Sequence, residues 1–101
     1  INSAWANAIG STLPEDTVPT RAFSGRLGRS IRTAYTEAAE KGPKPAPYPI
    51  QRNLTKAMRE SAIDIDTMQA WAGQSAGLAR AEPATELVRE LWTTAKKLLN
   101  S

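Results

Sequence analysis

Residues 71–80 have the sequence WAGQSAGLAR, which is the most informative stretch of the chain for its fold. We interpret residues 67–80 as one helix, or as two short helices bent near Gly73. Two glycines would cost such a helix about 1 kcal/mol each relative to alanine. Close approach of a neighbouring backbone or of a flat ligand would offset this cost, and both interpretations stay open. If a flat ligand approaches, Trp71 and Gln74, which are three residues apart, present an aromatic plane and an amide to it.

Apolar spacing predicts helices on both sides of this stretch. Residues 3–9 form two helical turns that stop at Gly10, and residues 25–40 form a longer helix capped by Ser24. Residues 50–62 form an amphipathic surface helix. The clearest helix follows Pro83 and places seven apolar side chains on one face, namely Leu87, Val88, Leu91, Trp92, Ala95, Leu98 and Leu99.

The segments between these helices are long and rich in proline. Residues 10–24 form a loop with a short extended piece at 17–23, and KGPKPAPYP at 41–49 is an extended connector or, alternatively, an SH3-type ligand. Asp64 and Asp66 mark a turn and cap the element that follows, rather than acting as a catalytic pair. No alternation typical of strands is visible. The predicted fold is therefore mainly α, with four to five helices on long Pro-rich connectors.

The composition excludes several chemistries. The 101 residues include 13 Lys+Arg, 10 Asp+Glu, and neither Cys nor His. A Cys/His zinc site, a thiol nucleophile and a Ser-His-Asp triad are therefore impossible within this sequence, and we expect no metal site. No stretch has the apolar length of a membrane span.

A cluster of arginines is the main charged motif: Arg21, Arg26, Arg29 and Arg32. Such a stripe contacts phosphates in some proteins, and Gly25 and Gly28 would let an anion approach a helix N-terminus. Arginine stripes are more often solvated or paired with carboxylates. We therefore interpret the cluster as structural.

Three stretches together resemble the C-terminal end of the nitronate monooxygenases, formerly nitropropane dioxygenases. They are TRAFSGRLGRSIR at 20–32, PAPYPIQRNLTKAMR at 45–59, and WAGQSAGLAR followed by PATELVRELW. The family consists of FMN-dependent oxidoreductases with an α/β (β/α)8 TIM barrel, so the resemblance implies that this chain is the C-terminal part of such a barrel. It further implies oxidation of alkyl nitronates with dioxygen to a carbonyl compound and nitrite.

The resemblance also implies roles for individual residues. Trp71, Gly73 and Gln74 match the family's A-G-Q segment and are expected near the flavin or the substrate. Arg26 and Arg29 match its S-G-R-x-x-R segment and are expected to anchor a loop through ion pairs. No catalytic residue is expected in this segment, and the FMN is held mainly by the barrel upstream.

We divide the chain into three parts: 1–24 as the end of a helix plus a connector, 25–66 as a helical lid, and 67–101 as C-terminal helices that pack on the barrel. The expected partners are the remainder of the barrel, a nitronate, dioxygen and a second copy in a homodimer. The expected location is cytoplasmic, and the isolated segment is expected to be inactive. The alternative function is a small basic helical module that binds nucleic acid or an acidic protein through Arg26, Arg29, Arg32, Lys56 and Arg59.

Overall fold

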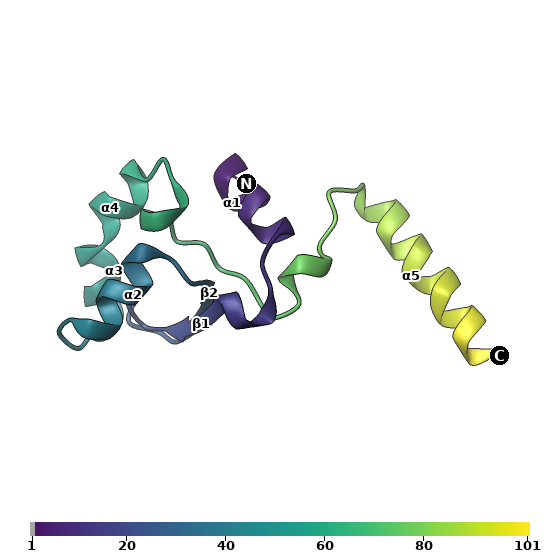
Figure 1. The fold of residues 1–101 in the computed structure, drawn as a ribbon, viewed down its shortest axis with the longest axis horizontal. Coiled ribbons are helices and arrows are strands. Elements are labelled where there is room, and N and C mark those ends of the chain that lie inside the picture. The colour runs from purple at the N-terminus through teal and green to yellow at the C-terminus, as the bar shows by residue number, and fades with distance from the viewer. Residues whose placement is uncertain (1) are drawn as a thin grey trace.

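The computed structural model describes residues 2–101 and is elongated, with extents of 53 × 24 × 23 Å. Figure 1 shows the reason: helix α5 (Ala84–Leu99), drawn in yellow-green, projects away from the rest of the chain. About half of the residues are helical, as predicted. The predicted absence of strands is wrong, because a two-stranded sheet lies at the centre of the remaining part.

The elements before α5 are short. In chain order they are α1 (Ser3–Gly10), the 3-10 turn η1 (Pro14–Asp16), β1 (Thr17–Thr20), β2 (Gly28–Ile31), α2 (Ala34–Lys41), α3 (Ile50–Leu54), α4 (Lys56–Ser61), and the 3-10 turns η2 (Ile65–Thr67) and η3 (Ala76–Leu78).

The sheet occupies a region where a helix is predicted. β1 and β2 are antiparallel, with Thr17 opposite Ile31 and Thr20 opposite Gly28. The predicted extended piece is therefore correct over 17–20, whereas the predicted helix over 25–40 is wrong in its first half. Gly25 has a φ of +92°, a left-handed conformation that a right-handed helix excludes. Ser24 accepts the Arg26 N–H within this turn and caps no helix.

Helix α2 starts nine residues later than predicted. Its N-cap is Thr33, whose hydroxyl accepts the Thr36 N–H, while the Thr36 hydroxyl accepts the Thr33 N–H. This reciprocal cap satisfies two backbone donors and fixes the start of the helix. The helix ends at Lys41, before Gly42, as the sequence predicts.

The helix predicted over 67–80 is also absent. Residues 68–72 are extended and pair with β2: the Ile31 N–H donates to the Ala70 carbonyl at 2.9 Å, and the Ala72 N–H donates to the Arg29 carbonyl at 3.1 Å. In this stretch only Thr67, the end of η2, and the turn η3 are helical. Because backbone groups here find partners on a strand 40 residues away, the local preference for helix does not decide the structure.

A small core joins the sheet to the helices. Its buried apolar side chains are Ala22, Phe23, Ile31, Met68 and Ala70, and its buried hydroxyl side chains are Thr12, Thr17, Ser30, Thr33, Thr36 and Thr55. The aromatic ring of Phe23 is fully buried and lies 5.0 Å from that of Tyr35, centroid to centroid. Because the apolar core is small, hydrogen bonds contribute much of the stabilisation of this fold.

The predicted helix over 50–62 consists of two pieces, α3 and α4, which meet at Thr55. The hydroxyl of this buried threonine donates to the Phe23 carbonyl at 2.6 Å and so attaches the helix pair to the core. Residues 44–47 of the proline-rich connector form neither helix nor strand, in line with the prediction.

The helices at the two ends of the chain are predicted correctly. α1 spans Ser3–Gly10 and α5 ends at Leu99, with Asn100 as its C-cap. The apolar face of α5 is exposed: Leu91, Trp92 and Leu98 are 60–71% accessible. None of the helices formed by residues 2–101 combines the length and apolar character that a membrane crossing requires.

Candidate functional site

A cleft of about 430 Å³ lies between the end of α1 and the turn η3. Residues 10–14 form one wall, and residues 74, 75, 77 and 78 form the other. Segments at least 60 residues apart in the sequence thus create one concave surface. Gln74, one of the three predicted site residues of the A-G-Q segment, lies in this cleft.

The two walls meet at Gly77. A β-carbon on this residue would lie 2.6 Å from the carbonyl oxygen of Thr12, so only glycine permits the observed approach. The close backbone contact that the small residues of 71–80 suggest is therefore present, although the segment is not a helix. Thr12 itself is buried, and its hydroxyl donates to the Ala8 carbonyl at 2.6 Å.

The cleft combines apolar and polar groups. Leu13 and Leu78 are 55% and 80% exposed, one on each wall. Gln74 and Ser75 are exposed beside them and contribute an amide and a hydroxyl. Apolar walls with a few polar groups are typical of small-molecule sites.

Trp71 lies apart from Gln74 and serves packing. Its indole ring is edge-on to Phe23, with centroids 5.5 Å apart, and a β-carbon on Gly28 would lie 2.8 Å from its Cζ3. Its carbonyl accepts the indole N–H of Trp5 at 3.1 Å, which attaches α1 to this segment. Since the predicted helix is absent, Trp71 and Gln74 do not share a helical face. Gly73 is exposed, and a β-carbon there would meet nothing within 4 Å.

Arg26 and Arg29 are held by neutral groups. The Arg26 guanidinium lies 3.8 Å from the centre of the Tyr48 ring, and Arg29 Nη1 donates to Thr17 Oγ1 at 3.0 Å. Within the described part of the chain, neither arginine has a carboxylate within 4.0 Å. Their anchoring contacts are thus a cation–π interaction and a hydrogen bond, in place of the expected ion pairs.

The other basic residues of the alternative interface are also engaged. Arg32 is 3.4 Å from Glu40, Lys56 is 3.9 Å from Glu60, and Arg59 donates to the Arg52 carbonyl at 2.9 Å. Among the described residues, the contacts of these three basic side chains give no support to the nucleic-acid alternative.

Asp64 caps the element that follows it, η2, as predicted, whereas Asp66 caps α2, which precedes it in the sequence. Asp64 accepts the Asp66 N–H at 3.0 Å, and Asp66 accepts the Ala34 N–H at the start of α2 at 2.9 Å. Within residues 2–101, no group of three or more acidic side chains is arranged to bind a metal ion.

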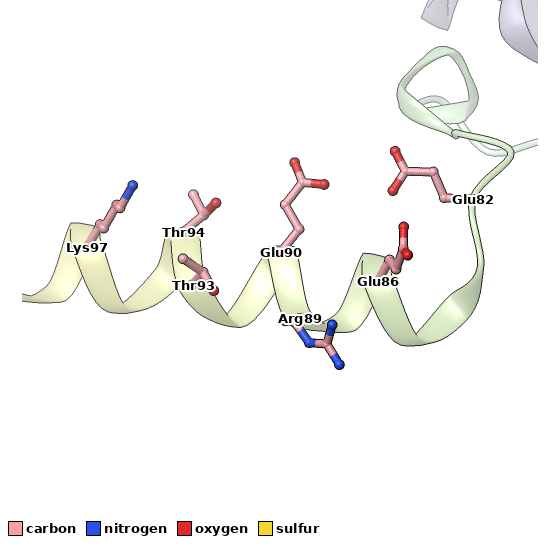
Figure 2. A pocket seen from close by; sticks show the side chains of 7 residues that line it. All are labelled: Glu82, Glu86, Arg89, Glu90, Thr93, Thr94 and Lys97. Carbon is pink, nitrogen blue, oxygen red and sulfur yellow. The ribbon is translucent and has the colours of Figure 1, made fainter.

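A second hollow runs along α5, and Figure 2 shows its seven side chains, all polar: Glu82, Glu86, Arg89, Glu90, Thr93, Thr94 and Lys97. Arg80 reaches this face from the preceding segment and contacts Glu90 and Glu82 at 3.0 and 3.3 Å. The hydrogen bond to Glu90 is the main cause of a raised Arg80 pKa. Exposed side chains of both signs are typical of a solvated helix face, so this hollow is not a candidate site.

Sequence reasoning missed the wall formed by residues 10–14, which we interpreted only as a loop. Gly77 was the available signal, because a glycine that disfavours helix implies close contact with some other segment. The sequence does not say which segment.

The described residues thus combine an open amphiphilic cleft with a helix, α5, whose apolar face is exposed. The family description "Nitronate monooxygenase" matches residues 2–94. The chain is 38% identical over 96 residues to the nitronate monooxygenase of Paraburkholderia phytofirmans, covering 90% of this chain and 26% of that protein. It is 37% identical over 89 residues to a probable nitronate monooxygenase of Staphylococcus aureus, covering 84% of this chain and 25% of that protein.

The chain belongs to the nitronate monooxygenase family of oxidoreductases, which confirms the resemblance seen in the sequence. It spans about a quarter of the length of the curated relatives it matches.

Proposed function

We propose that this chain forms part of the active-site wall of an FMN-dependent enzyme that oxidises alkyl nitronates with dioxygen to a carbonyl compound and nitrite. The observation that carries the proposal is the position of Gln74 on a cleft within a nitronate monooxygenase sequence. The reaction is proposed for the full-length protein, and the isolated chain is expected to be inactive.

The residues present fit one edge of an FMN site but not its phosphate. Gly73 leaves open space beside Gln74, so a planar ring can approach the backbone there. Backbone donors at the N-termini of α1 and α2 already have side-chain acceptors, since Ala4 N–H donates to Asn2 and Ala34 N–H donates to Asp66. The first turn of α5 carries Glu86, which repels a phosphate. We assign the phosphate to the part of the protein upstream of this chain, as the family resemblance implies.

When bound, FMN supplies the electron acceptor for this chemistry. The chain's own contribution is binding and orientation. The Gln74 amide can donate a hydrogen bond to a nitronate oxygen, and the two leucines of the cleft add apolar surface to its walls. The Trp71 ring packs against Gly28 and so fixes the position of the segment that leads to Gln74.

The proposal includes an arrangement of the parts. Residues 25–66 act as a lid over the site, and residues 67–101 pack on the remainder of the barrel through the exposed apolar face of α5. Burial of each apolar side chain of this size stabilises a protein by about 1.5–3 kcal/mol. The expected homodimer and cytoplasmic location belong to the same proposal.

The test is Gln74→Ala in the full-length protein. We expect at least a tenfold loss of nitronate turnover, or loss of bound flavin, because one hydrogen bond to a charged group contributes about 1.5–3 kcal/mol. Asn53→Ala, which removes an exposed amide on α3, is the matched control and should change neither. Unchanged turnover together with unchanged flavin content in Gln74→Ala would refute the assignment.

A further inference from the structure

We propose that helix α1 holds the turn that carries Gln74, and that Trp5 is the positioning residue through which it does so. The inference rests on the proposed function, in which Gln74 acts on the substrate. It assigns a role to a residue outside the three stretches that resemble the family. Trp5 lies in the first turn of α1, and its side chain is half-buried.

The segment before Gln74 is held along one edge by β2. Hydrogen bonds of 2.9 and 3.1 Å join the neighbours of Trp71, Ala70 and Ala72, to this strand. Trp71 itself lies opposite Ser30. Because hydrogen bonds alternate along an antiparallel pair, the backbone groups of Trp71 point away from β2. The Trp71 carbonyl therefore takes its partner from the other edge of the segment.

That partner is Trp5. Its indole N–H donates to the Trp71 carbonyl at 3.1 Å, so β2 and α1 hold the segment from its two edges. Since Gln74 follows Trp71 by only three residues, a shift of the Trp71 backbone moves the start of the turn that carries Gln74. Without the Trp5 donor, only β2 would hold this segment.

The other end of the turn also contacts the α1 region. The Ala76 N–H donates to the Gly73 carbonyl at 3.1 Å, which closes the turn around Gln74. Gly77 comes next and lies against the Thr12 carbonyl. Thr12 is attached to α1, because its hydroxyl donates to a carbonyl in the last turn of that helix at 2.6 Å. Figure 1 shows the end of α1, in purple, close to η3, in green.

Gln74 depends on these two contacts because the turn itself offers little packing. Gly73, Gln74 and Ser75 are all exposed, and a β-carbon on Gly73 would meet nothing within 4 Å. A displacement of about 1 Å can lower the turnover of an enzyme by about a hundredfold. The Trp5 hydrogen bond should therefore affect turnover, although Trp5 is not among the residues that line the cleft.

The experiment compares two substitutions of Trp5 in the full-length, flavin-loaded protein at about pH 8, where histidine is neutral. Trp5→His keeps a ring N–H at the place of the indole Nε1, whereas Trp5→Phe keeps an apolar ring and removes the donor. Each is made alone and together with Gln74→Ala. Asn7→Ala, which changes an exposed side chain of the same helix, is the control.

Three quantities are measured: hydrogen–deuterium exchange of residues 71–77, turnover of the nitronate of nitroethane per bound flavin, and urea unfolding, which shows that each variant is folded. Residues 71–77 should exchange about two- to tenfold faster in Trp5→Phe than in wild type, the effect of one lost neutral hydrogen bond. Exchange in Trp5→His should be slower than in Trp5→Phe. Asn7→Ala should match wild type.

Turnover should fall at least about fivefold in Trp5→Phe and should be partly restored in Trp5→His. In the Gln74→Ala background, Trp5→Phe should change turnover by less than about twofold, because the group that Trp5 positions is gone. An equal loss of turnover in both backgrounds would overturn the inference, since Trp5 would then act on stability alone.

Unchanged exchange of residues 71–77 in Trp5→Phe would also overturn it. Faster exchange in Trp5→His than in Trp5→Phe would do the same, because the size of the ring rather than its N–H would then hold the segment. If Gln74→Ala keeps wild-type turnover and flavin while exchange stays faster in Trp5→Phe than in Trp5→His, the proposed function fails and the hold of α1 on the turn is supported.

Discussion

The backbone of Thr12 lies so close to Gly77 that a β-carbon on residue 77 would stand 2.6 Å from the Thr12 carbonyl oxygen. This contact joins the end of α1 to η3 and sets the separation of the cleft walls. Nearby Gly73 has no such neighbour within 4 Å. The two glycines of the same segment therefore differ in what they permit.

Gly77→Ala should destabilise the full-length protein by about 1–3 kcal/mol, because the added methyl group must push a backbone carbonyl away. Gly73→Ala is the matched control and should change the free energy of unfolding by less than about 1 kcal/mol. Urea unfolding measures both variants, and equal effects would contradict the role of the Thr12 contact.

Thr55→Val should cost about 1–3 kcal/mol, because the valine leaves the Phe23 carbonyl without the hydrogen bond that Thr55 donates at 2.6 Å. The shape of the side chain is nearly unchanged, so the effect isolates the hydroxyl group. Thr85→Val, at an exposed position in α5, should have little effect. If both valine variants unfold at the wild-type urea concentration, the hydroxyl does not attach α3 and α4 to the core.

Tyr35 should ionise at a higher pH than a free tyrosine. Its pKa is raised by burial, and the hydrogen bond with Gln51 opposes the shift in part. Since the folded state holds the proton more tightly, this group stabilises the fold fully below the unfolded pKa of about 10, and its contribution falls as the pH rises through the folded pKa.

Absorbance titration of tyrosinate in wild type and in Tyr35→Phe isolates this group by difference. The difference curve should have its midpoint above pH 10, and the fall in stability between pH 10 and the folded pKa should be smaller in Tyr35→Phe. A midpoint at or below pH 10 would contradict the burial effect. Tyr48→Phe controls for the loss of one phenol at an exposed position.

Local patterns predicted the elements that depend on local interactions. The apolar stripe of α5 lies on a helix of 16 residues, and Gly42 with Pro43 ends α2 as expected. The errors lie at residues 25–31 and 67–80, where glycines and small residues permit either helix or extended chain. Their conformation depends on pairing among β1, β2 and residues 68–72, which no local window contains.

In the candidate site, too, local sequence patterns indicate some residues, whereas others depend on contacts between distant segments. The A-G-Q match pointed to Trp71, Gly73 and Gln74, and of these three only Gln74 lines the cleft. The opposite wall, with Leu13, could not be found in this way. The position of this wall depends on the path of the chain between α1 and β1. The contact between its Thr12 and Gly77 is visible only in the three-dimensional structure.

The apolar face of α5 should be buried in the full-length protein. Leu91→Asp should then cost at least about 2 kcal/mol there, because it removes apolar burial and introduces a charge. Thr94→Asp, on the polar face shown in Figure 2, is the control and should cost less than about 0.5 kcal/mol. In the isolated chain, where this face is exposed, both substitutions should be nearly neutral, and α5 amides should exchange faster with solvent than in the full-length protein. Equal, small costs of the two substitutions in the full-length protein would show that α5 stays uncovered.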